Sequence, residues 1–137
     1  MKRFEILHSV AAAFPDADID TDVIFPARFL LLLDKAGLGE HLFNERRRDQ
    51  SGALRPDFVL NRAPFDTARI LVAGPRFGSG SSREQAVWAL ADFGIACVIA
   101  PSFGEIFHAN CFKNGVLAIR AEPAVHAAIM QAAEAGE

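Results

Sequence analysis

Residues 68–101 read ARILVAGPRFGSGSSREQAVWALADFGIACVIAP, and this stretch decides the fold. Its first part, ARILVAG (68–74), is an apolar run that ends at a glycine and a proline, which is typical of a buried strand. Apolar residues at helical spacing predict a helix over residues 82–93, and IACVIA (95–100) predicts a second buried strand. A strand, a helix and a second strand in this order favour parallel pairing through a crossover helix.

The same alternation continues toward the C-terminus. We expect a short helix over residues 102–112, a strand over 115–119 and an alanine-rich helix over 123–134. Upstream, ILHSVAAAF (6–14) has the character of a strand, and VIFP (23–26) is predicted to be a short apolar strand that the proline ends. The sequence therefore predicts an α/β domain with a mostly parallel sheet and crossover helices, in which ligands bind beyond the carboxyl ends of the strands.

Two segments between these elements are less regular. Residues 29–37 contain four consecutive leucines, which fit a helix or a strand equally well. Residues 44–57 form the most polar stretch and are predicted to be a surface loop. Within it, ERRR (45–48) is predicted to be a solvated face, with an acidic partner as the alternative.

The composition limits the class of protein. A length of 137 residues indicates one domain over residues 1–137, and 51% hydrophobic residues are ample for a core. The net charge is −3, with both signs spread along the chain, so we expect neither a nucleic acid nor a membrane as partner. No segment has the length of a membrane span or the pattern of a signal peptide, and we therefore expect a cytoplasmic protein.

The loop GPRFGSGSS (74–82), between the first strand and the helix, is the main candidate site. Glycines let a ligand approach the backbone, and the amides at the start of a helix carry partial positive charge. Ser79, Ser81 and Ser82 add hydroxyl donors, and Arg83 adds a guanidinium that suits a carboxylate or a phosphate. The loop therefore predicts an anion site. A nucleotide is disfavoured, because both the third glycine of GxGxxG and a Gly-Lys-Ser/Thr motif are missing.

A purely structural role for the same serines has equal weight on pattern alone. Ser81 and Glu84 fit the capping box S-x-x-E, and Ser82 with Gln85 offers a second register. One serine can cap the helix while its neighbour faces solvent, so capping and anion binding are compatible. Capping alone does not account for the extra glycines.

Four aspartates alternate in DADIDTD (16–22). The glycine and the glutamate that a calcium loop needs are missing from the expected positions, so we reject calcium. Asp16 and Asp18 fit a solvated turn. Asp20 and Asp22 adjoin an apolar segment and are stronger candidates for a function.

No metal site is predicted. Cys97 lies in an apolar run and is expected in the core, and with Cys111 as the only other thiol the chain cannot build a zinc or iron–sulfur site. The four histidines have no ligand or nucleophile spacing and are expected at the surface or in packing: His8, His41, His108 and His126.

Five motifs occur in order along residues 4–120: DIDTDVIFPARFL, GLGEHLFN, PDFVLN, FGSGSSREQAVWAL and IAPSFGEIFHANCFKNG. In this combination the chain closely resembles the small subunits of 3-isopropylmalate dehydratase, a family of the aconitase superfamily. The resemblance implies a swivelling β/β/α domain that closes over an active site on a separate large subunit. Bacterial members of the family usually continue well past position 137, so it also implies that a C-terminal extension is missing.

The resemblance also implies an activity. The complex would interconvert 2- and 3-isopropylmalate, a small dicarboxylate substrate, by dehydration and rehydration in leucine biosynthesis. Cysteines of the large subunit would hold a [4Fe–4S] cluster, and this chain would bind no cofactor. One iron of that cluster would act as a Lewis acid on the leaving hydroxyl.

Matching positions imply the roles of individual residues. Ser81 corresponds to the serine that acts as base on the substrate carbon, and Ser82 and Arg83 correspond to residues that hold a substrate carboxylate. Thr21 and Asp22 correspond to a pair at the edge of the active site. The other residues expected to bind substrate or to read its side group are Gly80, Lys35, Phe29, Leu30, Leu31, Leu32 and Leu33.

Two positions depart from the family pattern. Gln85 stands where the family usually has histidine, and Lys35 stands where it usually has arginine, so the bidentate guanidinium is lost there. A related hydro-lyase acting on citramalate, dimethylmalate or another 2-hydroxydiacid is therefore an alternative. A further alternative is a non-catalytic module that uses the glycine loop to bind an anion.

Overall fold

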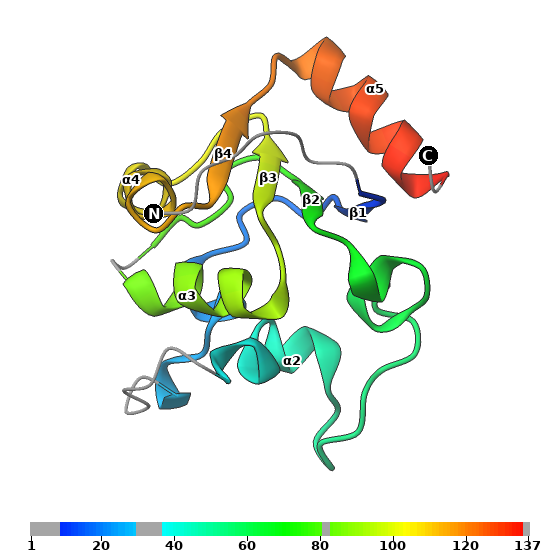
Figure 1. Cartoon of the computed structure of the whole chain (residues 1–137), viewed down its shortest axis with the longest axis vertical. Helices are drawn as coiled ribbons and strands as arrows, with labels where there is room; N and C mark the ends of the chain where they lie inside the picture. The colour runs from blue at the N-terminus through cyan, green and yellow to red at the C-terminus, as the bar shows by residue number, and fades with distance from the viewer. Residues whose placement is uncertain (1–8, 30–36, 81–82, 136–137) are drawn as a thin grey trace.

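A four-stranded parallel sheet forms the centre of the molecule (Figure 1). The computed structural model describes residues 9–29, 37–80 and 83–135. The strands stand side by side in chain order: β1 (Ala11–Phe14), β2 (Ile70–Ala73), β3 (Cys97–Ala100) and β4 (Leu117–Arg120). Every neighbouring pair is parallel, which confirms the predicted α/β fold.

Helices cover the two faces of this sheet. The crossovers after β2 and β3 contain α3 (Glu84–Phe93) and α4 (Glu105–Lys113), and α5 (Pro123–Glu134) follows β4. α3 and α4 contribute to the larger core, whereas α5 packs on the other face, over β1 and β2. In Figure 1, α3 and α5 accordingly lie on opposite sides of the strands.

The strand side chains alternate between these two faces, because successive residues of a strand point in opposite directions. Leu71 of β2 belongs to the larger core, and its neighbour Val72 packs with Met130 of α5. β4 lies farther from α5, and its side chains Leu117 and Ile119 are 44% and 39% exposed. The second face is thus covered only in part.

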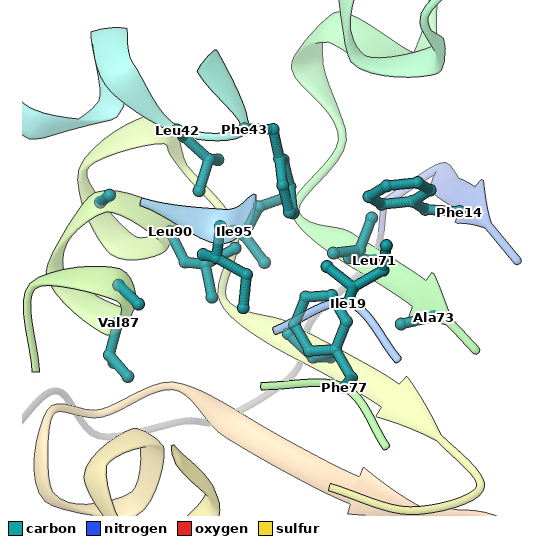
Figure 2. Packing of buried hydrophobic residues seen from close by; sticks show 14 of the residues in the cluster. Phe14, Ile19, Leu42, Phe43, Leu71, Ala73, Phe77, Val87, Leu90 and Ile95 are labelled. Atoms are coloured by element: carbon teal, nitrogen blue, oxygen red, sulfur yellow. The ribbon is translucent and has the colours of Figure 1, made fainter. Parts of the chain in front are cut away.

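The long connection between β1 and β2 is part of the core. Figure 2 shows Leu42 and Phe43 of this connection reaching toward the layer that contains Leu90, Ile95 and Leu71. Its helical elements are all short: α1 (Thr21–Ile24), η1 (Ala27–Phe29), η2 (Leu38–His41), α2 (Asn44–Arg47), η3 (Val59–Asn61) and η4 (Phe65–Thr67).

The elements predicted for the second half are confirmed in type and order. Strand and helix ends differ from the predicted ends by a few residues, as α3 illustrates by beginning at Glu84. The strand predicted within residues 6–14 is present as β1. No helix within the described ranges combines the length and the apolar character that a membrane span needs.

The strand predicted for VIFP (23–26) is wrong, because α1 occupies its first half. Asp20 is the N-cap of this helix, and its Oδ1 accepts a hydrogen bond from the Val23 amide at 2.9 Å. A capping aspartate satisfies an amide that the first turn of a helix leaves free. The cap and the surrounding packing thus stabilise a helix here, although the β-branched residues of the segment favour a strand.

The surface-loop prediction for residues 44–57 is wrong at its beginning, where α2 forms. Glu45 and Arg46 are exposed, in agreement with a solvated face. Arg47, however, is only 7% exposed and belongs to the interior.

Candidate functional site

The glycine loop leaves β2 and is held between two other parts of the chain. On one side, Ser79 pairs with Asp20 in an isolated parallel bridge, and the Thr21 amide donates to the Ser79 carbonyl at 2.9 Å. On the other side, Phe77 pairs with Phe103. The chain beyond β1, β2 and β3 therefore continues side by side, which gives the loop one defined path at the carboxyl edge of the sheet.

Two glycines of the loop are required for this path. Gly78 has a φ of +79°, and a Cβ atom at this position would overlap the buried ring of Phe107. Gly80 is exposed and has a φ of +95°, in a region that residues with side chains rarely adopt. The extra glycines thus have a structural reason of their own, in addition to any approach of a ligand.

Arg83 stands in the N-cap position of α3, just beyond the loop. Its Nη1 donates to Oδ1 of Asp22 at 2.9 Å and to the Phe25 carbonyl at 3.3 Å. These are its hydrogen bonds within the described part of the chain, so Nε and Nη2 keep their donors for a ligand. Since only 16% of the side chain is exposed, the guanidinium is well placed to bind a carboxylate away from competing water.

Asp22 faces Arg83 from the first turn of α1, and 62% of its side chain is exposed. Its Oδ1 also accepts the Ala27 amide at 3.0 Å. The hydrogen bond from Arg83, and then the one from Ala27, hold the pKa of Asp22 below its ordinary value. The carboxylate is charged at neutral pH and orients the guanidinium. An ion pair this exposed is weak, so a ligand carboxylate can join it or replace Asp22.

Thr21 and Asp22 both lie at this edge of the sheet, but they point in different directions. Thr21 is 2% exposed and supports the loop through its amide. Together with Arg83 and Gly80, the exposed Asp22 forms the part of the candidate site that the structure describes. This position agrees with the general location of ligand sites in parallel sheets.

The remaining predicted site residues lie outside the described residues, with one exception. Those outside are Ser81, Ser82, Leu30, Leu31, Leu32, Leu33 and Lys35. The exception is Phe29, a half-buried residue whose ring stacks on His41 with 4.0 Å between centroids. The capping-box hypothesis falls on the same two serines. The described helix begins at Glu84, whose Oε2 accepts a hydrogen bond from Nδ2 of Asn114 at 2.9 Å.

Sequence reasoning missed a network around Arg47. Its Nη1 donates to the carbonyls of Gly39, Glu40 and Leu42 at 3.0, 3.3 and 3.3 Å, and its guanidinium lies 4.7 Å from the ring centroid of Phe93. Burial, and then the nearby charge of Arg48, lowers the pKa of Arg47 from its ordinary value. An arginine remains charged despite such a shift.

The same segment is bound from the opposite side by Asp92 of α3. Its Oδ2 accepts the amides of Gly37 and Gly39 at 3.1 and 2.9 Å. In the sequence, only the pair of glycines indicates a turn at this position, and it does not indicate which residues bind the turn.

The two thiols do not fit an iron–sulfur cluster. Cys97 lies in the core, as predicted, and Cys111 is fully buried. Burial raises the pKa of Cys97 to about 11 and that of Cys111 to about 12, so both are neutral thiols at pH 7, whereas metal ligation needs thiolates. Within the described ranges, no group of three or more His, Cys, Asp or Glu residues is placed to hold a metal ion.

Comparison with known proteins identifies the family. Residues 1–124 match the family model of the aconitase C-terminal domain. The chain belongs to the aconitase C-terminal domain family. A solved structure of this family's fold is the 3-isopropylmalate dehydratase of Methanocaldococcus jannaschii, which is 36% identical with a TM-score of 0.65. The similarity covers 83% of this chain and 61% of that one.

Curated relatives confirm the resemblance to small subunits of 3-isopropylmalate dehydratase. The small subunit of Gluconacetobacter diazotrophicus is 53% identical over 136 residues, which cover 99% of this chain and 66% of the relative. That of Rhodospirillum centenum is 52% identical, with 99% and 67% covered. That of Rhodospirillum rubrum is 56% identical over 119 residues, with 87% and 58% covered. The chain thus spans about two thirds or less of the length of these relatives.

Proposed function

We propose that this chain is the small subunit of a 3-isopropylmalate dehydratase and that it completes the active site only together with a large subunit. The observation that carries the proposal is Arg83, a largely buried guanidinium whose Nε and Nη2 have no acceptor among the described residues, beside an exposed glycine of the loop. The relatives called small subunits of this enzyme, at more than half identity over most of the chain, support the proposed substrate class. Residues 1–137 would act as one swivelling domain.

Arg83 would bind a carboxylate of the substrate. Nε and Nη2 of its guanidinium can make two parallel hydrogen bonds to the two oxygens, while Nη1 stays bonded to Asp22. Ser82 would contribute its hydroxyl to the same carboxylate. Gly80 would let the substrate approach the backbone, because a glycine has no side chain of its own and this one is exposed.

Ser81 would act as the base that removes the proton from the substrate carbon. A serine hydroxyl ordinarily has far too high a pKa for this task, so an alkoxide needs a positive environment. Two features of the described residues support such an environment. Arg83 lies two positions away, and the N-terminal end of the α3 dipole carries partial positive charge.

Residues 29–33 would read the side group of the substrate, because a phenylalanine and four leucines suit an isopropyl group. Lys35 would add a positive charge without the fork of an arginine. Thr21 would act indirectly, through its bond to the Ser79 carbonyl, since its side chain is buried.

The large subunit would hold the [4Fe–4S] cluster, which supplies a Lewis acid for the leaving hydroxyl when it is bound. The reason lies in the chemistry of this chain's donors: its two cysteines are neutral, buried thiols. The chain itself would contribute carboxylate binding, the base and the exclusion of water.

The proposal is tested by assaying the chain alone and together with its large subunit. We expect no iron and no hydration of isopropylmaleate for the isolated chain, and turnover only when the two subunits are combined. Turnover by the isolated chain, or none by the combined subunits with an intact cluster, would contradict it.

A related substrate is the second candidate, favoured by Lys35 and Gln85, which depart from the family pattern. The combined subunits should then convert citramalate or dimethylmalate with a higher kcat/KM than 2-isopropylmalate. Comparing the three diacids in one assay distinguishes the two candidates.

A further inference from the structure

The side chain of Asn114 joins the end of α4 to the beginning of α3. Its Nδ2 donates to Oε2 of Glu84 and to the Asn110 carbonyl, both at 2.9 Å, and its Oδ1 accepts a hydrogen bond from Nε1 of Trp88 at 3.1 Å. Glu84 is the first residue of α3, and Trp88 lies about one turn further along the same helix. One amide group therefore holds two successive positions on the N-terminal part of α3.

The orientation of this amide group is determined by its partners. An indole N–H only donates a hydrogen bond, so the oxygen of Asn114 must face Trp88 and the nitrogen must face the carboxylate of Glu84. Among side chains of this shape, neither aspartate nor leucine offers both the two donors and the acceptor that the arrangement uses. The contact is thus specific for an amide.

Asn114 is itself fixed in place. It is the C-cap of α4, and its backbone N–H donates to the carbonyls of Asn110 and Cys111, both at 3.1 Å. The inner side of α4 belongs to the larger core through Phe107 and Cys111. Figure 1 shows α4 on the side of the molecule where α3 begins. A packed helix therefore supports the start of α3.

Glu84 also faces Lys113, but this contact is weaker. The distance from Oε1 of Glu84 to Nζ of Lys113 is 3.7 Å, and 65% of the lysine side chain is exposed. An ion pair this long and this exposed contributes little to stability. Of these two contacts, the hydrogen bond from Asn114 is the one that defines where Glu84 lies.

Arg83 directly precedes the supported turn. Its backbone continues into α3, while Nη1 of its guanidinium bonds to Asp22 at 2.9 Å and to the Phe25 carbonyl at 3.3 Å. Helix ends fray more readily than helix interiors. Fraying of the first turn would move the backbone of Arg83, and with it the guanidinium, away from these partners.

We propose that Asn114 is a positioning residue for Arg83: by bonding to Glu84 and Trp88, its amide keeps the first turn of α3 in place and so holds the guanidinium beside Asp22. The inference rests on the proposed function, in which Arg83 binds a carboxylate of the substrate. The support matters for binding, because a side chain that is already directed loses less conformational freedom when the ligand arrives.

The first test measures the contact between Arg83 and Asp22 in the isolated chain. The hydrogen bond from Arg83 is the main cause of the lowered pKa of Asp22. In Asn114→Ala, the pKa of Asp22, followed by NMR of its carboxyl carbon, should rise toward the ordinary value of 3.8. Part of the lowering should remain, since the Ala27 amide keeps its bond to Asp22. An unchanged pKa of Asp22 would overturn the inference.

Asn61→Ala is the matched control for this test. The amide of Asn61 likewise makes three hydrogen bonds, donating to the carbonyls of Arg47 and Arg55 and accepting from Nε of Arg47, but it lies in the connection between β1 and β2. Asn61→Ala should lower the stability of the chain by a similar amount and leave the pKa of Asp22 at its wild-type value. A rise in the pKa of Asp22 equal to that in Asn114→Ala would contradict the inference.

Trp88→Phe is a milder variant, because it keeps an aromatic ring and removes the Nε1 donor. It should raise the pKa of Asp22 by less than Asn114→Ala does. If Asn114→Ala does not fold, Trp88→Phe decides, and an unchanged pKa of Asp22 in this variant contradicts the inference.

The second test is a double-mutant cycle in the complex with the large subunit. The kcat/KM for 2-isopropylmalate should fall about 10-fold in Asn114→Ala, an effect within the range that coupled residues show. In an Arg83→Lys background the guanidinium is absent, so the same substitution should change kcat/KM by less than about 2-fold. Asn61→Ala should have the same small effect in both backgrounds.

The two possible failures are distinguishable. A wild-type complex that does not convert 2-isopropylmalate contradicts the proposed function, whereas the pKa of Asp22 needs neither substrate nor large subunit and still decides whether Asn114 positions Arg83. If the complex is active and Asn114→Ala lowers kcat/KM equally in both backgrounds, Asn114 only stabilises the fold and the inference is wrong.

Discussion

Two arginines of this chain, Arg47 and Arg83, are both largely buried, but their surroundings differ. Around Arg47, three backbone carbonyls accept hydrogen bonds, Asn61 accepts another from Nε, and the ring of Phe93 covers the guanidinium. Around Arg83, one nitrogen serves both partners, and the acidic partner, Asp22, is exposed.

The difference separates a structural arginine from one that is available to a ligand. At Arg47, Nε and Nη1 donate to the chain and the ring of Phe93 covers the guanidinium, so this side chain stabilises the 37–47 segment and is shielded from a ligand. At Arg83, Nε and Nη2 have no acceptor among the residues that the structure describes, and they lie beside the glycine loop, where a carboxylate can reach them. Burial of a charge therefore indicates a ligand site only when its hydrogen-bonding capacity is not already used.

The largest expected effect concerns Ser81, the proposed base on the Arg83 side. Ser81→Ala should lower kcat of the complex by about 10²–10⁴-fold, the range typical of losing a general base. KM should change far less, and the denaturant midpoint of the isolated chain should stay near that of wild type. Ser51→Ala, in an exposed turn outside the candidate site, is the control and should remain active. If Ser81→Ala is instead less stable by about 1 kcal/mol with kcat retained, and Ser81→Asp restores the stability, the serine is a helix cap.

Substitution of Arg47 should lower the stability of the chain. Arg47→Met removes the arginine donor from the buried Leu42 carbonyl and from the partly buried Glu40 carbonyl, and should lower the free energy of unfolding by about 3–5 kcal/mol, since hydrogen bonds to a charged group contribute about 1.5–3 kcal/mol each. Arg48→Met is the neighbouring control, because in the described part of the chain the Arg48 side chain is bonded to a single carbonyl, that of Gly52. Denaturant unfolding of both variants measures the difference. Equal losses in the two would show that the carbonyl network at Arg47 contributes little.

A third prediction concerns Gly78, where the glycine loop packs against Phe107. Gly78→Ala introduces a Cβ atom into the ring of Phe107 at a positive φ, and should cost about 2–4 kcal/mol from strain and overpacking together. Gly52→Ala has the same kind of φ, +88°, but open space around it, so it should cost only about 1 kcal/mol. The difference between their midpoints isolates the packing contribution. A loss in Gly78→Ala no greater than that in Gly52→Ala would contradict the close packing.

The smallest effect is expected at Asp22. Its pKa is lowered in the folded chain, chiefly by Arg83, so its stabilisation is full above the ordinary value of 3.8 and is lost as the pH falls through the lower folded value. Because the carboxylate is exposed, Asp22→Asn should cost at most about 0.5 kcal/mol at pH 7. The difference from wild type should shrink as the pH is lowered below 3.8. A difference that is constant with pH would mean that the charge of Asp22 is not involved.

Local patterns predicted the second half of the fold correctly. β2, α3, β3, α4, β4 and α5 each have a continuous apolar run or a helical spacing, and these signals depend on neighbours in the sequence. The strand predicted at residues 23–26 failed for the opposite reason. There, one capping contact from Asp20 and the packing of the connection decide the conformation.

The candidate site, too, could be predicted only where its residues are neighbours in the sequence. Gly80 and Arg83 stand close together in the sequence, so their shared chemistry could be recognised from it. Asp92 could not be recognised, because its partners Gly37 and Gly39 lie 55 and 53 residues away. Arg47 resembled its exposed neighbours in ERRR, and nothing in the pattern indicated that Phe93 covers it.

The most direct test of the distinction between the two arginines is Arg83→Lys, measured for stability in the isolated chain and for kcat/KM on 2-isopropylmalate in the complex. Lysine keeps the charge but loses the bidentate fork. We expect a change of at most about 1 kcal/mol in the free energy of unfolding. We expect kcat/KM to fall by about 30- to 1000-fold, which corresponds to the roughly 2–4 kcal/mol that truncating a buried charged contact costs. A large loss of stability with unchanged kinetics would contradict the account, because it would make Arg83 a structural arginine like Arg47.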